Sequence, residues 1–540
     1  MALDDVILAL QRGLDRLARR LLGGSPPDPV GRRLLVVQID GLSRHVLLKG
    51  IATGRMPFTR RLLERHHYEL EPMSVGLPTS TPAFQMGVMY GVRPDIPGFH
   101  YYDRRLRRDV HFPRPGHAAQ VEHDQAAGRR GILEGGSAYG CVFTGGAAND
   151  LFSFSRLTRP SGRGLLRALS PVVVVVWVVL KNGARTLLEL VRALAYGVAD
   201  PVDGWRRWRW LTVQIGLSVW VRGFFTLAAS RDVYTGRRAV YVNYLDYDVF
   251  AHAFGPESRQ AVRALRRVDR SIHQLWRVVR RVPEHRYDFY VLADHGQVLC
   301  QSFREITGGR RLERWILEHL VGPSAASGAE EGRRLALAHG LRVRRRESPG
   351  LIQHFLNYLD EDFLRKRDPE AYERDGLRAI AAGPNAFLYV LDAPEPLQVD
   401  AIERRVPGLA ETLSRSPGIG FVLARSPDGP VCFWRGKRHQ LGDDDPGPFS
   451  GRPDAGLVLD GVADLMAMPS AGDLVIYGID APGGHVSFIP EHGAHAGPSP
   501  EEMQTFVVRP PHVSVPVPLR HPVQLYEHFV RYAHPDGDGR

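Results

Sequence analysis

Cysteine is scarce in this chain. Only three cysteines occur among its 540 residues, and they lie far apart and never in a CxxC pair. They are Cys141, Cys300 and Cys432. The spacing excludes a disulfide framework and a thiolate zinc site, and the low count fits a reducing compartment.

Signals for export and for membrane spanning are also missing. Residues 1–30 contain Asp4, Asp5 and several arginines, but not the basic start, apolar centre and small-residue cleavage site of a signal peptide. We expect an amphipathic helix and a linker there. The run PVVVVVWVVL at 171–180 is too short to cross a bilayer. A cytoplasmic or peripherally membrane-associated protein is therefore favoured.

No long basic tract interleaved with aromatic residues is present. The formal net charge is +11, mostly from arginine, but the arginines are scattered in short clusters such as 104–108, 206–209 and 342–346. We therefore expect no nucleic-acid partner. The positive balance could belong to a solvated surface or help to attract anions, and both interpretations stay open.

Short β-branched runs are abundant. LLVVQID at 34–40 is typical of a buried parallel strand that ends in a carboxylate. The similar runs are AVYVNYLD at 239–246, FYVLAD at 289–294, AFLYVLD at 386–392 and DLVIYG at 473–478. Helical patterns lie between them. This alternation predicts an α/β fold with a mostly parallel central sheet flanked by helices on both faces, and with the chemistry at the carboxyl ends of the strands.

The alternation breaks at 165–232, a hydrophobic stretch that includes WRRWRW at 205–210. Trp and Arg together suit a membrane interface. We expect a helical insertion, either packed on the core or making peripheral membrane contact through residues 165–230. The flanking segments 31–160 and 233–540 are expected to form one catalytic domain.

Hydroxyl side chains are crowded in LPTSTPAFQMGVMYG, residues 77–91, where Thr79, Ser80 and Thr81 lie between two prolines. Ser, Thr and Pro are preferred at helix starts, so capping is one interpretation. The other is a nucleophile placed at a helix N-terminus, where negative charge is favoured. The two interpretations are compatible.

Aspartate and histidine recur in three later segments that follow apolar runs: LDYDVFAHAFGPES, ADHGQ and PEHGAHAG. Asp248 and His252 are four residues apart, so a helical turn lets both reach one cation. Asp294 and His295 are neighbours, which can share a cation only in a loop, because neighbours on a strand point to opposite faces. His492 lies in a Gly-containing loop.

Two of these assignments have rivals. His495 lies in the same loop as His492, and Asp246 competes with Asp248, although only Asp248 has the four-residue spacing to His252. The donors suffice for two cations bound by nitrogen and oxygen, and zinc suits such ligands.

The ordered set resembles the alkaline phosphatase superfamily and, within it, the type I phosphodiesterase/nucleotide pyrophosphatase family. The resemblance spans about residues 34–510, with 165–230 unmatched. It rests on QIDGL, on Thr81 lying ten residues before the Gly of YGVRP, on the D-x-x-x-H of Asp248 and His252, on ADHG, and on the late His492-Gly493.

The resemblance implies an alkaline-phosphatase-like fold with insertions and two divalent metal ions, with zinc favoured. One ion would be held by Asp248, His252 and His492. The other would be held by a set that includes the nucleophile: Asp40, Thr81, Asp294 and His295. The implied activity is hydrolysis of a phosphodiester or pyrophosphate bond in a small-molecule phosphate ester, through a phosphothreonine intermediate on Thr81.

The chain departs from the family pattern near the nucleophile. Pro82 follows Thr81 directly, and Tyr102 stands where nucleotide-cleaving members carry an Asn that touches the phosphate. Ala83 and Gln85 argue against a formylglycine sulfatase. The alternatives that stay open are a phosphomonoesterase and a membrane-associated phospho-lipid or phospho-alcohol hydrolase or transferase.

Overall fold

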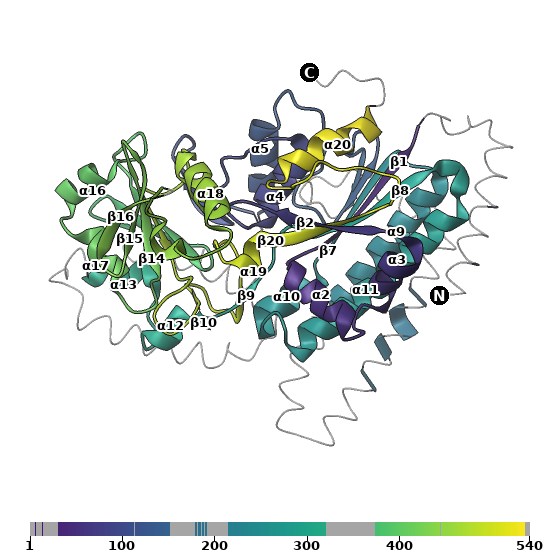
Figure 1. Ribbon diagram of the computed structural model, residues 1–540, viewed down its shortest axis with the longest axis horizontal. Helices are drawn as coiled ribbons and strands as arrows, with labels where there is room; N and C mark the ends of the chain where they lie inside the picture. The colour runs from purple at the N-terminus through teal and green to yellow at the C-terminus, as the bar shows by residue number, and fades with distance from the viewer. Residues whose placement is uncertain are drawn as a thin grey trace.

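The computed structural model describes residues 31–151, 214–319 and 373–534, except 113 and 443, together with isolated residues before 31 and between 179 and 191. The expected N-terminal helix of residues 1–30 and most of the insertion at 165–232 lie outside the described residues. Two sheets dominate the described part and lie side by side in Figure 1, each with its own helices.

One sheet has seven strands in the order β2-β20-β8-β1-β7-β5-β6, and we call it the larger sheet because its strands contain more residues than those of the other. These are β1 (Arg33–Ile39), β2 (Glu69–Ser74), β5 (Ser137–Tyr139), β6 (Asn149–Leu151), β7 (Ala239–Tyr244), β8 (Tyr287–Leu292) and β20 (Gln504–Arg509). Strand β20 pairs antiparallel with both its neighbours, and the other pairs are parallel. The mostly parallel central sheet is thus confirmed.

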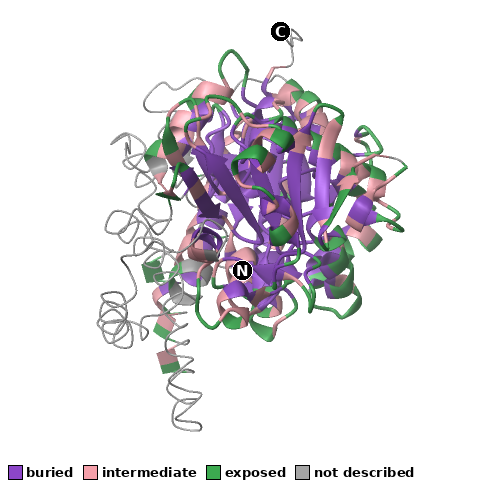
Figure 2. Ribbon diagram, turned by 90° about the vertical axis from the view of Figure 1, so that its left-hand side faces the viewer, coloured by how far each residue is buried: buried purple, intermediate pink, exposed green. Residues whose placement is uncertain are grey.

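Helices cover both faces of this sheet (Figures 1 and 2). One face carries α2 (Arg44–Ala52), α3 (Pro57–His66), α9 (Arg222–Thr235), α10 (Asp246–Phe254) and α11 (Arg259–Arg281); the other carries α4 (Thr81–Tyr90), α5 (Pro115–Gln125) and α20 (Val523–Ala533). Strand β1 shows why both faces must be covered. Leu34 and Val36 join the apolar cluster on one side, whereas Leu35, Val37 and Ile39 join the other.

The smaller sheet corrects part of the expected topology. AFLYVLD and DLVIYG do form strands, β13 (Asn385–Val390) and β17 (Leu474–Tyr477), but they pair antiparallel in a separate seven-stranded sheet. The other strands there are β11 (Glu373–Arg374), β12 (Leu377–Ala381), β14 (Phe421–Ser426), β15 (Gly429–Trp434) and β16 (Lys437–Gln440). A buried apolar run looks the same whether its strand lies in a parallel or in an antiparallel sheet. The hydrophobicity of these two segments therefore could not predict which sheet they join.

We call this second unit the distal lobe, residues 303–319 and 373–481. Its helices are α12 (Phe303–Ile306), α13 (Leu312–His319), α16 (Val399–Arg405), α17 (Leu409–Ser414) and α18 (Ala455–Ala467). It packs firmly on the first unit, because Phe387 and Tyr389 share an apolar cluster with Leu34. Arg104 also donates from Nη2 to Asp473 Oδ2 across the junction, at 2.6 Å.

Short pairings join the remaining segments. They are β3 (His100–Asp103) with β4 (Arg108–His111), β9 (Val298–Leu299) with β19 (Gly493–Ala494), and β10 (Gln301–Ser302) with β18 (Val486–Ser487). Helix α19 (Pro500–Met503) precedes β20. Through β18 and β19, the chain leaves the distal lobe and returns to the larger sheet.

The described end of the insertion packs on the core. A π-helix at Gln214–Val221 leads into α9, whose first residue, Arg222, is buried. Its guanidinium donates to Asp246 Oδ2 at 3.0 Å and to Ser271 Oγ at 2.7 Å.

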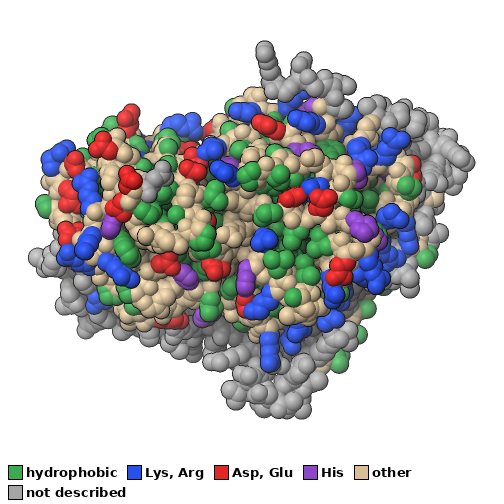
Figure 3. Space-filling view, viewed as in Figure 1, with side chains coloured by type: hydrophobic (Ala, Val, Ile, Leu, Met, Phe, Trp, Pro, Cys, Tyr) green, Lys and Arg blue, Asp and Glu red, His purple; other side chains and the backbone are tan. Residues whose placement is uncertain are grey.

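In the described part of the chain, no helix is long and apolar enough to cross a membrane. On the face drawn in Figure 3, Lys and Arg lie scattered among other side chains.

Candidate active site

Three buried side chains meet where β1 and β8 end. Asp40 directly follows β1, and Asp294 and His295 follow β8 in a loop. Their residues are at most 2% exposed. His295 Nε2 lies 3.4 Å from Asp294 Oδ2 and 3.7 Å from Asp40 Oδ1. The loop therefore lets two sequence neighbours face one point, as the sequence analysis required.

Thr81 occupies the start of α4, beside this cluster. The helix begins at Thr81 with Ser80 as its N-cap, and Pro82 lies in its first turn. The Thr81 hydroxyl donates to Asp40 Oδ1 at 3.3 Å, and Oγ1 is 3.1 Å from His295 Nε2. The expected helix start is confirmed, although Ser80 makes no side-chain capping bond. The placement puts a hydroxyl at the positive end of a helix dipole.

Helix α10 contributes Asp248 and His252 from one turn. His252 Nε2 is 3.4 Å from Asp248 Oδ2, which realises the four-residue spacing. Gly41 makes room for this pair: its φ is +73°, and a Cβ there would lie 2.5 Å from Asp248 Oδ1. The alternative to Asp248, Asp246, is instead paired with Arg222. Its carboxylate accepts a hydrogen bond from the buried Arg222 guanidinium.

The late loop brings His495 to the site and leaves His492 outside it. The His492 side chain is exposed. Its backbone N–H donates to His252 O at 2.8 Å, and its backbone carbonyl accepts from Cys300 N at 2.9 Å. The main chain of His492 therefore faces the protein, whereas its ring faces solvent. The His495 ring centroid instead lies 3.7 Å from that of His295 and 4.9 Å from that of His252. The geometry therefore favours the rival assignment, His495, over His492.

Thr79 holds this late loop against the start of α4. Its hydroxyl accepts from Ala496 N at 3.0 Å and donates to Gly497 O at 3.0 Å. Ala496 has a φ of 112°, a conformation that residues other than glycine rarely adopt. One of the three crowded hydroxyls thus fixes the strained turn that carries His495.

The three histidines share one protonation pattern. Each Nδ1 faces a backbone carbonyl: His252 that of Gly493 at 2.8 Å, His295 that of Gly296 at 3.1 Å, and His495 that of Thr79 at 2.8 Å. A carbonyl only accepts, so each Nδ1 carries the proton. In the neutral ring this leaves the Nε2 lone pair free, which is the form that binds metals.

Burial dominates the electrostatics of the site, and neighbouring like charges add to it. Burial, reinforced by Asp294 and Asp248, raises the pKa of Asp40 well above its ordinary value. Burial likewise raises the pKa of Asp294, against the opposing effects of His295 and Thr81. Burial, aided by His295 and His252, lowers the pKa of His495 well below its ordinary value. A cation placed among these groups would stabilise the ionised carboxylates and the neutral imidazole.

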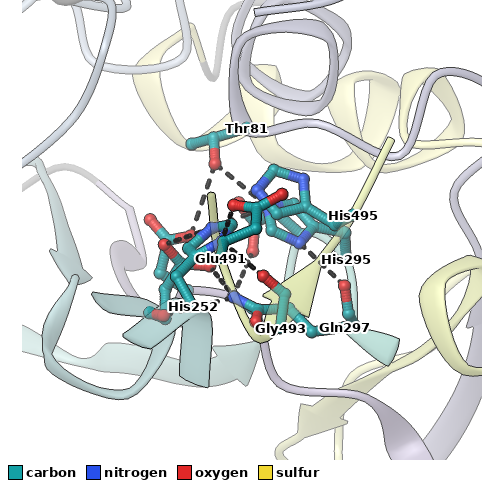
Figure 4. A network of polar contacts seen from close by, with 12 residues as sticks. Thr81, His252, His295, Gln297, Glu491, Gly493 and His495 are labelled. Carbon is teal, nitrogen blue, oxygen red and sulfur yellow. Dashed lines mark hydrogen bonds and ion pairs between the residues drawn. The ribbon is translucent and has the colours of Figure 1, made fainter. Parts of the chain in front are cut away.

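The donor set fits metal ions. Within the described part of the chain, two groups of side chains bring ligand atoms within 4.8 Å of one another. One is Asp40, Asp294 and His295; the other is Asp248, His295 and His495. Asp294 Oδ2 is buried and takes part in no hydrogen bond among the described residues, which leaves an acceptor for a cation. Figure 4 shows His252, His295 and His495 close together below Thr81.

Residues 188–378 match the sequence profile of a family described as type I phosphodiesterase / nucleotide pyrophosphatase. The match covers less than half of the 540-residue chain. Over these residues the chain is similar to this family of phosphodiesterases and pyrophosphatases. The matched segment includes Asp248, His252, Asp294 and His295. It begins inside the 165–230 stretch, which the sequence analysis had left unmatched.

Solved structures give a fainter likeness. A phosphonoacetate hydrolase from Sinorhizobium meliloti 1021, in complex with phosphonoformate, is 14% identical over 95% of this chain and 98% of its own, with a TM-score of 0.47. The same enzyme in complex with phosphonoacetate is 15% identical over the same shares of the two chains, with a TM-score of 0.44. A comparison with curated protein sequences finds no match.

Three further polar residues that contact these side chains were not identified from the sequence. Asn243 donates from Nδ2 to Asp40 Oδ2 at 2.7 Å. Gln297 Nε2 donates to Asp248 Oδ1, and Glu491 Oε2 lies 2.8 Å from His252 Nδ1. Each stands within or beside a motif that was already quoted. Polar residues near a strand end commonly serve as caps or in turns, so their residue type alone does not indicate a role in the site. Their position within the quoted motifs was the one available signal.

Proposed function

We propose that this protein hydrolyses a phosphodiester or pyrophosphate bond in a small-molecule phosphate ester, with Thr81 as nucleophile and two divalent ions as cofactors. One observation carries the proposal. The Thr81 hydroxyl lies at the N-terminus of α4, 3.3 Å from Asp40 Oδ1 and 3.1 Å from His295 Nε2, within a cluster of buried carboxylates and imidazoles. A hydroxyl so placed combines a helix dipole with nearby metal ligands.

We assign Asp40, Thr81, Asp294 and His295 to one ion. The other ion is assigned to Asp248, His252 and His495, with His495 in place of His492 because only His495 faces the cluster. Carboxylate and imidazole donors suit zinc, so zinc is the metal that we propose. When bound, such ions supply positive charge that makes the Thr81 hydroxyl more acidic and stabilises the charge of an in-line displacement.

The residues of the chain have separate roles in the proposed reaction. Asp40 Oδ1 accepts the hydrogen bond of the Thr81 hydroxyl and thereby orients Oγ1. Attack by Oγ1 on phosphorus forms an O–P bond on Thr81 and breaks the bond to the leaving alcohol or phosphate, whose oxygen takes up the proton that the hydroxyl gives up. Water then cleaves the phosphothreonine and restores the hydroxyl. The start of α4 favours the anionic phosphoryl group during both steps.

The test combines metal content with turnover. Wild type and Thr81→Ala are purified, bound metal is counted by mass spectrometry, and turnover of bis-p-nitrophenyl phosphate is compared with that of p-nitrophenyl phosphate. We expect about two zinc ions per chain, faster turnover of the diester, and a loss of activity of at least about 10³-fold in Thr81→Ala. Faster turnover of the monoester would make the enzyme a phosphomonoesterase. Absence of metal and of turnover would refute the proposal.

A further inference from the structure

One of the three site histidines is held differently from the others. His295 and His495 direct Nδ1 at a backbone carbonyl, whereas Nδ1 of His252 also faces the carboxylate of Glu491. We propose that Glu491 is a positioning residue: it holds His252 so that Nε2 points at the ion shared with Asp248, and it strengthens that ligand. The inference rests on the proposed function, because it assumes that His252 binds metal.

The contacts fix the ring in one orientation. Glu491 Oε2 and Gly493 O each lie 2.8 Å from His252 Nδ1. The carbonyl can only accept, so the Nδ1 proton is shared between it and the carboxylate. The opposite nitrogen, Nε2, consequently faces Asp248 Oδ2 at 3.4 Å. A carboxylate behind an imidazole makes Nε2 a more basic ligand and sets the direction of its lone pair.

Glu491 is itself held in place. Its side chain is 2% exposed, and its second oxygen, Oε1, accepts from Ser487 Oγ at 2.6 Å. Both carboxylate oxygens are therefore occupied, which a buried ionisable group requires. Ser487 ends β18, and Glu491 precedes β19. A series of contacts thus leads from Ser487, in the segment that leaves the distal lobe, through Glu491 to His252 at the proposed metal position. Figure 4 shows Glu491 and His252.

Asp248 receives a comparable contact on its other side. Gln297 Nε2 donates to Asp248 Oδ1 and to the Asp248 carbonyl, the latter at 3.2 Å. This leaves Oδ2 as the oxygen that faces His252. Two ligands of one ion are therefore oriented from behind by two side chains that do not bind the ion. A purely structural Glu491 would anchor the loop without affecting metal affinity, and this difference is what the experiment measures.

The experiment measures metal binding to the full chain, and activity is not its only readout. Glu491→Ala, Glu491→Gln and the control Glu501→Ala are prepared; Glu501 is exposed and lies ten residues further along the chain. Zinc affinity at each position is measured by competition with a chromophoric chelator. The absorption spectrum of the Co²⁺-loaded protein reports the ligand geometry. Thermal unfolding of each metal-free variant tests whether it folds.

We expect Glu491→Ala to weaken one of the two zinc positions about 10- to 100-fold, to leave the other unchanged, and to alter the Co²⁺ spectrum. Glu491→Gln keeps an acceptor for His252 without the charge, so its loss should be intermediate. Glu501→Ala should match wild type. Wild-type affinity at both positions in a folded Glu491→Ala protein would overturn the inference. If the wild-type protein itself binds no metal, the proposed function is refuted. That result differs from wild-type metal affinity in Glu491→Ala, which refutes only the role of Glu491.

Discussion

His495 stacks on His295, with ring centroids 3.7 Å apart and an interplanar angle of 18°. The two residues come from different parts of the chain: His295 follows β8 of the larger sheet, and His495 follows the segment that returns from the distal lobe. Their contact joins the loop after β8 to the segment that returns from the distal lobe. It also makes His495, and not the neighbouring His492, the late histidine available to a metal.

The first prediction separates these two histidines. His495→Ala removes a proposed ligand that faces the cluster, so it should lower the bound zinc from two ions toward one and reduce kcat/KM by at least about 10²-fold. His492→Ala removes an exposed side chain and should leave both quantities close to wild type. Metal counting and steady-state kinetics check the pair. The reverse order of effects would restore His492 as the ligand.

The second prediction concerns the end of the hydrophobic insertion. Arg222 is buried in α9 and donates to Asp246 and Ser271. Arg222→Ala deprives a buried carboxylate of its guanidinium, which should lower the free energy of unfolding by about 3–5 kcal/mol. Arg263→Ala, at an exposed position of α11, should change it by less than about 0.5 kcal/mol. Urea unfolding measures both. Equal small effects would mean that α9 does not depend on this ion pair.

The third prediction concerns pH and a buried carboxyl group that is not one of the proposed metal ligands. Burial raises the pKa of Glu502 to about 7, although bonds from Ser499 and Gly497 oppose the shift. The unfolded value is about 4.3. The folded state therefore binds the proton more tightly, and this contribution to stability is complete below about pH 4 and is lost as the pH rises to about 7.

Glu502→Gln should remove this contribution. Between pH 5 and 8, the free energy of unfolding of wild type should fall more steeply than that of Glu502→Gln, by a difference on the order of 2 kcal/mol. Both proteins are unfolded with urea in the presence of a chelator, so that metal binding does not contribute. Glu501→Gln is the matched control, because its side chain is exposed. Parallel pH profiles for wild type and Glu502→Gln would contradict the prediction.

Local patterns in the sequence predicted several parts of the site. The carboxylate after an apolar run placed Asp40 at a strand end, and the four-residue spacing placed Asp248 and His252 on one helical turn. The hydroxyl cluster correctly marked the start of α4 at Thr81. These features depend on short-range geometry, which periodicity and capping preferences report directly.

Features that depend on long-range packing could not be predicted. The choice of His495 over His492 follows from the turn at Ala496 and its anchor on Thr79, residues more than 400 positions apart. The contact of Glu491 with His252 joins segments 239 residues apart. The antiparallel distal lobe was missed for a similar reason, since strand partners are not encoded in the hydrophobicity of one strand.

The most direct test of the account is to trap the covalent intermediate. The zinc-loaded enzyme is mixed with bis-p-nitrophenyl phosphate, quenched in acid within milliseconds and digested, and the peptide that contains Thr81 is examined by mass spectrometry. The account predicts a nitrophenylphosphoryl adduct on Thr81 that forms early, decays with turnover and is absent from Thr81→Ala. Full turnover by Thr81→Ala, or an adduct on another residue, would contradict it.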